Sequence, residues 1–247
     1  MKKFTIVLLC CASSLCAQMT VAAAASMQIA LKEMQTEFAK ETGKAFGTVY
    51  GASGKLTAQI KNGAPFDVFM SADMSFPESL AVAKLTDGKP MVYARGTLVI
   101  WSLRISDLSD YKKVLLDSAC NKIAIADPRT APYGRAAVAF LHNEKIFGSI
   151  EHKIVYGDNV SQTAQYILTG SVDVGITAKS LAVAPEAAQK GHWVELPNAK
   201  YPPVDHGMVV LLHGKDNNPK ESKTFLDFVL SANGQKILER CGFMGIK

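Results

Sequence analysis

Four positions in the chain could together bind an anion through neutral hydrogen-bond donors. Each lies where a predicted strand runs into a predicted helix: Ser26, Ser53, Tyr133 within Pro132-Tyr133-Gly134, and Val160 within Asn159-Val160. The first N–H groups of a helix have no intrahelical partner, and the helix dipole gives them partial positive charge. Proteins bind oxyanions at such helix starts without a full positive charge. One helix start is a weak signal, because an isolated Ser26 or Ser53 is more often an ordinary cap.

Enzymatic chemistry is less favoured by the same residues. The segment Gly51-Ala52-Ser53-Gly54-Lys55 lacks the spacing of the G-x-S-x-G nucleophile elbow. It is not a Walker A loop either, because Val49 stands where the first glycine is needed and Leu56 where Ser or Thr would bind magnesium. The five histidines are dispersed and form no HExxH pair: His142, His152, His192, His206 and His213. We therefore assign no catalytic residue, although a secreted serine hydrolase with a triad assembled from distant positions stays open.

Charged and aromatic residues near these turns have an ordinary interpretation. Lys55 and Arg135 each follow a glycine at a predicted helix start, and Asp73 is the nearby acid. We interpret all three as solvated surface charges, which add only a weak attractive field for an anion. Tyr133 and Trp101 are interpreted as core side chains.

The elements that must position the four turns alternate between strand and helix patterns. Met27, Leu31, Met34 and Phe38 have the spacing of one helical face, with Ser26 as the predicted N-cap and Gly43 as the stop. The alternation predicts α/β layers with a parallel sheet. Strands are predicted at 19–24, 45–50, 66–71, 97–101, 122–126, 153–156, 172–177 and 208–212, and further helical stretches at 56–60, 135–143, 161–169 and 219–241.

Composition places the chain among globular proteins. Its 247 residues are 48% hydrophobic and 20% charged, which disfavours disorder, collagen and coiled coil and fits one large or two modest domains. The 27 basic residues lose Lys2 and Lys3 with the predicted leader, which leaves 25 against 22 acidic ones and a net charge of +3. We see no clustered Lys and Arg, so the sequence does not predict a nucleic-acid partner.

The N-terminus has the pattern of a secretory signal peptide. A charged start, Met1-Lys2-Lys3, precedes a short apolar run, and small residues favour removal of residues 1–17. A lipid-anchored start at Cys16 is less favoured. Two cysteines, Cys120 and Cys241, remain in an oxidising compartment, where one disulfide and two buried free thiols are equally open. They do not make a zinc site with the scattered histidines.

Several longer segments together resemble a known family. The most specific are Ala23-Ala24-Ala25-Ser26, then Gly51-Ala52-Ser53-Gly54-Lys55-Leu56 with Gln59-Ile60, and the run from Gly63 to Asp73; Ala126-Asp127-Pro128, Gly157-Asp158-Asn159-Val160 and Arg240-Cys241-Gly242-Phe243 support them. In order and spacing they resemble the periplasmic molybdate-binding proteins of ABC transporters, within the two-lobed solute-binding superfamily. The resemblance covers nearly all of the predicted mature chain.

This resemblance implies a type II periplasmic-binding-protein fold, with a mixed, mainly parallel sheet in each lobe and a hinge between the lobes. One lobe would be 18–96 completed by 206–247, and the other 97–205. The ligand would be molybdate or tungstate, held by hydroxyl and backbone N–H groups of Ser26 and Ser53 and by backbone N–H groups of Tyr133 and Val160. No cofactor and no direct protein–metal ligand is implied. The protein would be a periplasmic monomer that delivers the oxyanion to an ABC permease in the membrane.

One position departs from part of that family. Ala178 stands where some members place a tyrosine whose hydroxyl reaches the anion, so Thr177, the Tyr133 side chain or a water would have to replace that donor. Other ligands keep the fold and stay open: sulfate, phosphate, another oxyanion or an organic acid. Phosphate would favour a nearby acceptor, for which Asp158 is the one candidate acid, whereas ferric iron is disfavoured because Tyr133, Tyr156 and Tyr166 do not obviously converge.

Overall fold

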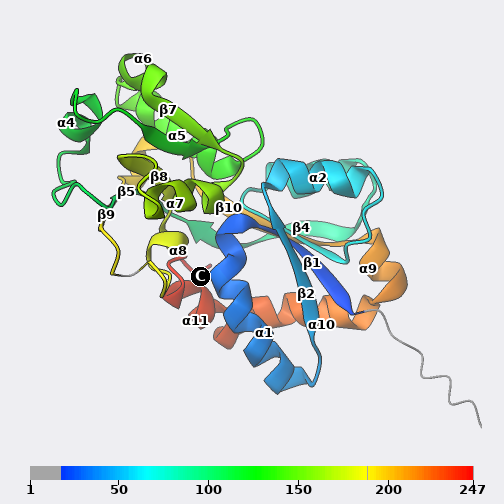
Figure 1. Ribbon diagram of the computed structural model, residues 1–247. Helices are drawn as coiled ribbons and strands as arrows, with labels where there is room; N and C mark the ends of the chain where they lie inside the picture. The colour runs from blue at the N-terminus through cyan, green and yellow to red at the C-terminus, as the bar shows by residue number, and fades with distance from the viewer. Residues whose placement is uncertain (1–17, 188, 247) are drawn as a thin grey trace, which may run out of the picture.

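The computed structural model describes residues 18–187 and 189–246, and the predicted signal peptide, residues 1–17, lies outside them. The strands form two five-stranded sheets that lie in separate lobes (Figure 1). The chain passes from the first sheet to the second between Gly96 and Leu98, and it returns between Glu195 and Val204. We call the part around the first sheet lobe 1 and the part around the second sheet lobe 2.

Lobe 1 combines strands from both ends of the chain in the order β2-β1-β3-β10-β4. Strand β1 pairs in parallel with β2 and β3, whereas β10 pairs in antiparallel fashion with β3 and β4. The strands are β1 (Met19–Ala24), β2 (Phe46–Gly51), β3 (Val68–Ser71), β4 (Thr86–Gly96) and β10 (Val204–Leu211). The helices are α1 (Gln28–Thr42), α2 (Ser53–Lys61), α3 (Ser75–Val82), α9 (Leu212–Asn217), α10 (Pro219–Leu230) and α11 (Ala232–Arg240).

Helices cover both faces of this sheet, which the alternation along β1 requires. Val21 and Ala23 pack into the core beneath α1, α10 and α11, and Ala22 packs into the core beneath α2 and α3. Because β1 is buried on both faces, it reads as a continuous run of small and apolar residues. Helix α1 ends at Gly43, whose positive φ of 68° suits a left-handed C-terminal position, as its sequence predicted.

Lobe 2 repeats the arrangement with the order β7-β6-β8-β5-β9. Strand β6 is parallel to β7 and β8, whereas β5 is antiparallel to β8 and β9. The strands are β5 (Leu98–Ser102), β6 (Ile123–Ala126), β7 (Ile154–Gly157), β8 (Val174–Ala178) and β9 (His192–Glu195). The helices are α4 (Tyr111–Leu116), α5 (Pro132–Asn143), α6 (Phe147–Ile150), α7 (Val160–Leu168) and α8 (Lys179–Ala182).

Two edge strands, one helix break and the helices α3, α4, α6, α8 and α9 were not predicted. Strand β4 carries Gly88 and Pro90, which read as a turn but are tolerated on a strand at the sheet edge. Strand β9 is short and also lies at an edge. The helical stretch predicted over 219–241 is two helices, because Ser231 leaves the helical conformation with a ψ of 162° and its side chain caps α11 by accepting from the Gly234 N–H.

The two cysteines are free, so the disulfide left open by the sequence is excluded. Cys120 is buried in the core of lobe 2 and Cys241 in the core of lobe 1. Burial raises the pKa of the Cys120 thiol to about 11 and that of Cys241 to about 12. Both thiols are therefore protonated and unreactive near neutral pH.

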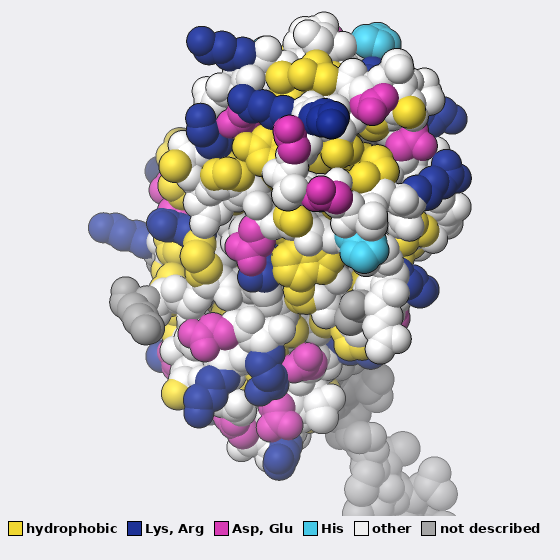
Figure 2. All heavy atoms as spheres, turned by 90° about the vertical axis from the view of Figure 1, so that its left-hand side faces the viewer, with side chains coloured by type: hydrophobic (Ala, Val, Ile, Leu, Met, Phe, Trp, Pro, Cys, Tyr) yellow, Lys and Arg dark blue, Asp and Glu magenta, His cyan; other side chains and the backbone are white. Residues whose placement is uncertain are grey.

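One face of the molecule mixes charges of both signs. On the face shown in Figure 2, basic and acidic side chains alternate among apolar ones rather than gathering into a patch of one sign. Within 18–187 and 189–246, no helix is long and apolar enough to span a bilayer, and no group of three metal-binding side chains occurs.

Candidate anion-binding site

Four of the five predicted contact residues line one small cavity between the lobes. Ser26 and Ser53 come from lobe 1, and Tyr133 and Val160 come from lobe 2. The wall is completed by small or neutral residues: Ala25, Gly51, Ala52, Ala72, Ala131, Pro132 and Asn159. Each helix start alone was a weak signal for an anion site, but the fold brings all four together in one cavity lining.

On the lobe 1 side, the two serines have different partners. Ser26 lies inside the short three-ten turn from Ala25 to Met27, so its prediction as the N-cap of α1 is wrong; Met27 occupies that position. The Ser26 Oγ is fully buried and has no hydrogen-bond partner among the residues that the structure describes. Ser53 is the first residue of α2, and its Oγ accepts a hydrogen bond from the Ala72 N–H at 3.0 Å. That bond leaves the Ser53 hydroxyl hydrogen free to donate.

On the lobe 2 side, the helix starts leave backbone donors for a ligand. Pro132 is the first residue of α5, so the Tyr133 N–H is the first N–H of that helix, and the N-cap Ala131 offers no side-chain acceptor. Asn159 is the N-cap of α7, and its side chain accepts from the N–H groups of Ser161 and Gln162. The N–H of Val160, one residue earlier, lacks an intrahelical partner by its position.

The fifth predicted position is not part of this wall. Ala178 ends β8, is fully buried and pairs with Leu98, away from the cavity lining. Both side chains expected to replace its donor have partners within the fold. The Thr177 Oγ1 donates to the Val160 carbonyl at 3.2 Å, and the Tyr133 hydroxyl shares a hydrogen bond with His206 Nε2 at 3.2 Å.

Tyr133 belongs to a buried cluster where the chain crosses between lobes. The other ring nitrogen of His206 shares a hydrogen bond with the Tyr93 hydroxyl at 3.1 Å. Burial lowers the pKa of His206 to about 3, against the weaker opposing effect of Asp205, and it raises the pKa of Tyr133. These rings are therefore neutral near pH 7, so the cluster fixes the start of α5 without adding charge. A Cβ on Gly96 would lie 1.9 Å from the Tyr133 hydroxyl oxygen, so this approach requires glycine.

Charged groups stand at the rim of the cleft instead of in the cavity. Arg135 of lobe 2 forms an ion pair with Asp73 of lobe 1, and Lys55 of lobe 1 pairs with Asp158 of lobe 2 at 2.8 Å. The interpretation of Lys55, Arg135 and Asp73 as merely solvated charges is therefore incomplete, because each joins the two lobes. Asp158 is engaged at the surface and is absent from the cavity lining.

The cavity is small and neutral. Its volume is ≈ 10 Å³, and each of its lining residues is uncharged. About 10–15 Å³ on this measure is the minimum for one water molecule. A space of this size holds at most about one water molecule, so a larger ligand requires the lobes to separate slightly. A neutral wall of donors suits an anion that carries acceptors only.

Sequence reasoning missed the residues that make the cavity narrow. Ala72 lines the wall and donates its N–H to Ser53, and Gly54 donates its N–H to the Thr130 carbonyl of the other lobe at 2.9 Å. A Cβ on Gly54 would lie 3.1 Å from the Thr130 Cα. The available signal was the small residues on either side of each serine, which allow close backbone approach.

Comparisons with known proteins agree with this architecture. Residues 19–244 match the family model of bacterial extracellular solute-binding proteins. A molybdate-binding protein of Azotobacter vinelandii is 33% identical over 237 residues, covering 96% of this chain and 93% of that protein. A molybdate-binding protein of Rhodobacter capsulatus is 32% identical over 92% of this chain and 88% of its own length.

A solved structure shares the whole fold. The periplasmic molybdate-binding protein of Azotobacter vinelandii superposes with a TM-score of 0.85 at 28% identity, covering 93% of this chain and 100% of that one. The predicted two-lobed binding-protein fold is confirmed, and these relatives are binding proteins rather than enzymes, as the sequence predicted. The chain belongs to the family of bacterial extracellular solute-binding proteins, alongside the periplasmic molybdate-binding proteins.

Proposed function

We propose that this protein captures molybdate, and tungstate as its close analogue, in the cavity between the lobes. The observation that carries the proposal is the buried Ser26 hydroxyl, which has no partner among the residues described and lies in a cavity lined by three further helix-start residues. A buried polar group without a partner costs free energy. A bound oxyanion would satisfy that hydroxyl. The molybdate-binding relatives named above support this choice of ligand.

The donor set suits a fully ionised tetrahedral oxyanion. Hydroxyl and backbone N–H groups of Ser26 and Ser53 would approach from lobe 1, and backbone N–H groups of Tyr133 and Val160 from lobe 2. All are donors, so a ligand without protons of its own satisfies them best. Selectivity over sulfate would follow from cavity size, because donors placed for longer metal–oxygen bonds leave a smaller anion's hydrogen bonds stretched.

Phosphate is supported less well. At neutral pH phosphate carries a proton on one oxygen, and a site for it benefits from an acceptor. Asp158, the acid that the sequence offered for this role, is paired with Lys55 outside the cavity.

Capture would be coupled to hinge bending. The donors belong to two lobes, so only a closed arrangement brings all of them onto one ligand, and binding shifts the open–closed equilibrium. We propose that the closed, liganded monomer then docks on an ABC permease from the periplasmic side. No bond of the oxyanion is made or broken in this cycle.

A thermal-shift titration tests the ligand. The mature protein is melted with molybdate, tungstate, sulfate, phosphate or no addition. A ligand at 100 times its Kd stabilises by about 2.7 kcal/mol, which raises Tm by roughly 5 to 10 °C for a chain of this size. We expect this rise with molybdate and tungstate alone. A rise in Tm with sulfate or phosphate instead would show that one of these anions is the ligand. No rise in Tm with any oxyanion would overturn the proposal.

A further inference from the structure

A hydroxyl of lobe 2 holds the backbone of Ser26 across the cleft. Ser180 lies in α8, two residues after Ala178, and its Oγ donates to the Ser26 carbonyl oxygen at 2.9 Å. The two residues are 2% and 0% exposed. The bond therefore lies in a buried interface between the lobes and is not a surface contact.

A second lobe 2 hydroxyl holds the preceding carbonyl. The Ser161 Oγ of α7 has two acceptors in lobe 1, the Ala25 carbonyl oxygen and Gln28 Oε1, each at 3.3 Å. The Ala25 carbonyl and the Ser26 N–H belong to the same peptide group, which is planar. Fixing the carbonyls on both sides of Ser26 therefore fixes the direction of its N–H and the position of its Cβ and hydroxyl.

We propose that Ser180 is a positioning residue for the anion site. Its bond to the Ser26 carbonyl forms as the lobes close and holds the Ser26 hydroxyl and N–H where they donate to the bound oxyanion. This inference rests on the proposed hinge-bending capture of an oxyanion. Because the partners belong to different lobes, the bond exists only in the closed form and adds to the stability of that form alone.

The segment that contains Ala178 contacts the anion site through hydroxyls that bind backbone carbonyls, and Ser180 supplies one of them. The segment Thr177-Ala178-Lys179-Ser180 supplies no hydroxyl to the cavity wall. Its two hydroxyls instead donate to the carbonyls of Val160 and Ser26, one contact residue in each lobe. The segment therefore acts on the anion site through the backbone of residues that line it.

The first test separates affinity from fold stability. Ser180→Ala leaves the Ser26 carbonyl buried without this partner, a loss that we expect to raise the molybdate Kd roughly 10-fold in isothermal titration calorimetry. Its melting temperature without anion should match that of the wild type, because the bond is absent when the lobes are apart.

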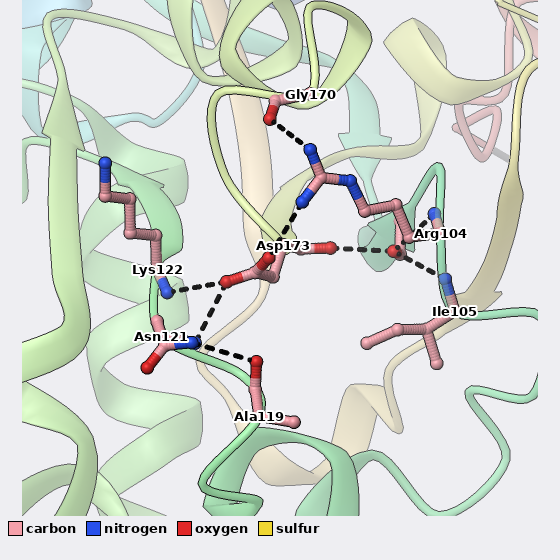
Figure 3. Close-up of polar contacts among 8 residues, drawn as sticks. Arg104, Ile105, Ala119, Asn121, Lys122, Gly170 and Asp173 are labelled. Carbon is pink, nitrogen blue, oxygen red and sulfur yellow. Dashed lines mark hydrogen bonds and ion pairs between the residues drawn. The ribbon is translucent and has the colours of Figure 1, made fainter.

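Ser102→Ala is the matched control. The Ser102 Oγ also donates to a carbonyl, that of Asp173 at 2.7 Å, and accepts from the N–H groups of Arg104 and Ile105. Figure 3 labels these three partners, Asp173, Arg104 and Ile105. All of these groups lie in lobe 2, so their bonds persist when the lobes open. We expect this variant to melt at a lower temperature without anion and to keep the wild-type Kd.

A second test asks whether Ser180 acts through Ser26. Ser180→Ala is measured again in a Ser26→Ala background, which keeps the carbonyl but removes the positioned hydroxyl. We expect a smaller change in Kd there, because coupled residues give non-additive effects. An equal change in both backgrounds, or an unchanged Kd in the single variant, would overturn the positioning role. Failure of the wild type to bind any oxyanion would instead overturn the proposed function.

Discussion

The two serine hydroxyls in the cavity differ in what the protein itself gives them. The Ser53 Oγ accepts from the Ala72 N–H, whereas the Ser26 Oγ has no partner among the residues described. Under the proposed function, the Ser53 hydroxyl serves both the fold and the anion site, and the Ser26 hydroxyl serves the anion site alone. A buried hydroxyl without a structural partner is expected where a ligand, not the fold, satisfies it.

Replacing each serine by alanine should separate these roles. Ser26→Ala should weaken molybdate binding about 10-fold or more without lowering the Tm of the anion-free protein, because no bond within the fold is lost. Ser53→Ala should weaken binding and also lower that Tm, because the Ala72 N–H loses its acceptor. Calorimetric titration and anion-free melting check both. A lowered anion-free Tm for Ser26→Ala would show that its hydroxyl serves the fold instead.

His206 predicts an acid-dependent loss of stability. It is buried against Tyr93, Tyr133 and Phe243, with Asp205 beside it in the chain, and its pKa falls from 6.5 to about 3 on folding. The unfolded chain binds the proton more readily, so the stability is complete above pH 6.5 and is lost as the pH falls toward 3. The loss from this site is up to about 1.4 kcal/mol per pH unit.

His206→Gln should make the acid side of the stability profile shallower. Urea unfolding between pH 7 and pH 4 measures the free energy of unfolding of the wild type and the variant. The comparison of slopes isolates His206, because carboxylates elsewhere titrate alike in both proteins. Parallel profiles would contradict the prediction.

At the scale of elements, the site depends on where helices begin relative to the sheet edge. Helix α5 starts close against β6: a Cβ on Gly134 would lie 2.2 Å from the Ala126 carbonyl oxygen. This contact is with backbone, which cannot move aside as the end of a side chain can. Gly134 therefore lets the first turn of α5, with the Tyr133 N–H, lie close to the end of β6.

Gly134→Ala should displace that turn. We expect the variant to lose about 1 to 3 kcal/mol of stability through overpacking and to bind molybdate more weakly because the Tyr133 N–H moves. Gly148→Ala in α6 is the control, since nothing lies within 4 Å of its added Cβ. That change should be neutral or stabilise by a few tenths of a kcal/mol to about 1 kcal/mol. Melting and titration of both variants check this, and unchanged binding by Gly134→Ala would count against it.

Across the whole molecule, two ion pairs join the lobes at the rim of the cleft. The Arg135–Asp73 pair is the less exposed, with side chains 41% and 18% exposed, and the Arg135 guanidinium also lies 5.1 Å from the centre of the Phe76 ring. The Lys55–Asp158 pair is 50% and 67% exposed. Water and salt screen exposed pairs, so the two should contribute unequally to closure.

Arg135→Gln should therefore speed molybdate release more than Lys55→Gln. We expect a roughly five-fold increase in the dissociation rate constant for Arg135→Gln, corresponding to about 1 kcal/mol, and little change for Lys55→Gln. Stopped-flow displacement at two salt concentrations measures both rates. Arg135 is the better position to change, because Asp73 also accepts from the Phe76 N–H at the start of α3. Equal increases of the dissociation rate constant for the two substitutions would contradict a special role of the Arg135–Asp73 ion pair in holding the lobes closed.

Local sequence was enough to predict most elements and the helix-start donors. Hydrophobic periodicity located α1, and the turns at Ser53, Tyr133 and Val160 lie within one residue of a helix start. These features depend on residues within a few positions of one another, so a single chain segment reveals them. The edge strand β4 was not predicted because it is partly exposed and carries the turn residues Gly88 and Pro90, and β9 was not predicted because it has only four residues, none of them buried.

Tertiary structure decided which groups meet and which donors remain free. The Tyr133 hydroxyl is hydrogen-bonded to His206, and the Thr177 hydroxyl donates to the Val160 carbonyl. Arg135 forms an ion pair with Asp73. Ser180 donates to Ser26, which lies 154 residues earlier in the chain. Each of these pairings depends on how two sheets and their connecting segments pack together. The sequence therefore indicates which groups can bind an anion, but only long-range packing makes Ser26 a lining residue of the cavity and leaves its hydroxyl buried and unpaired within the described fold.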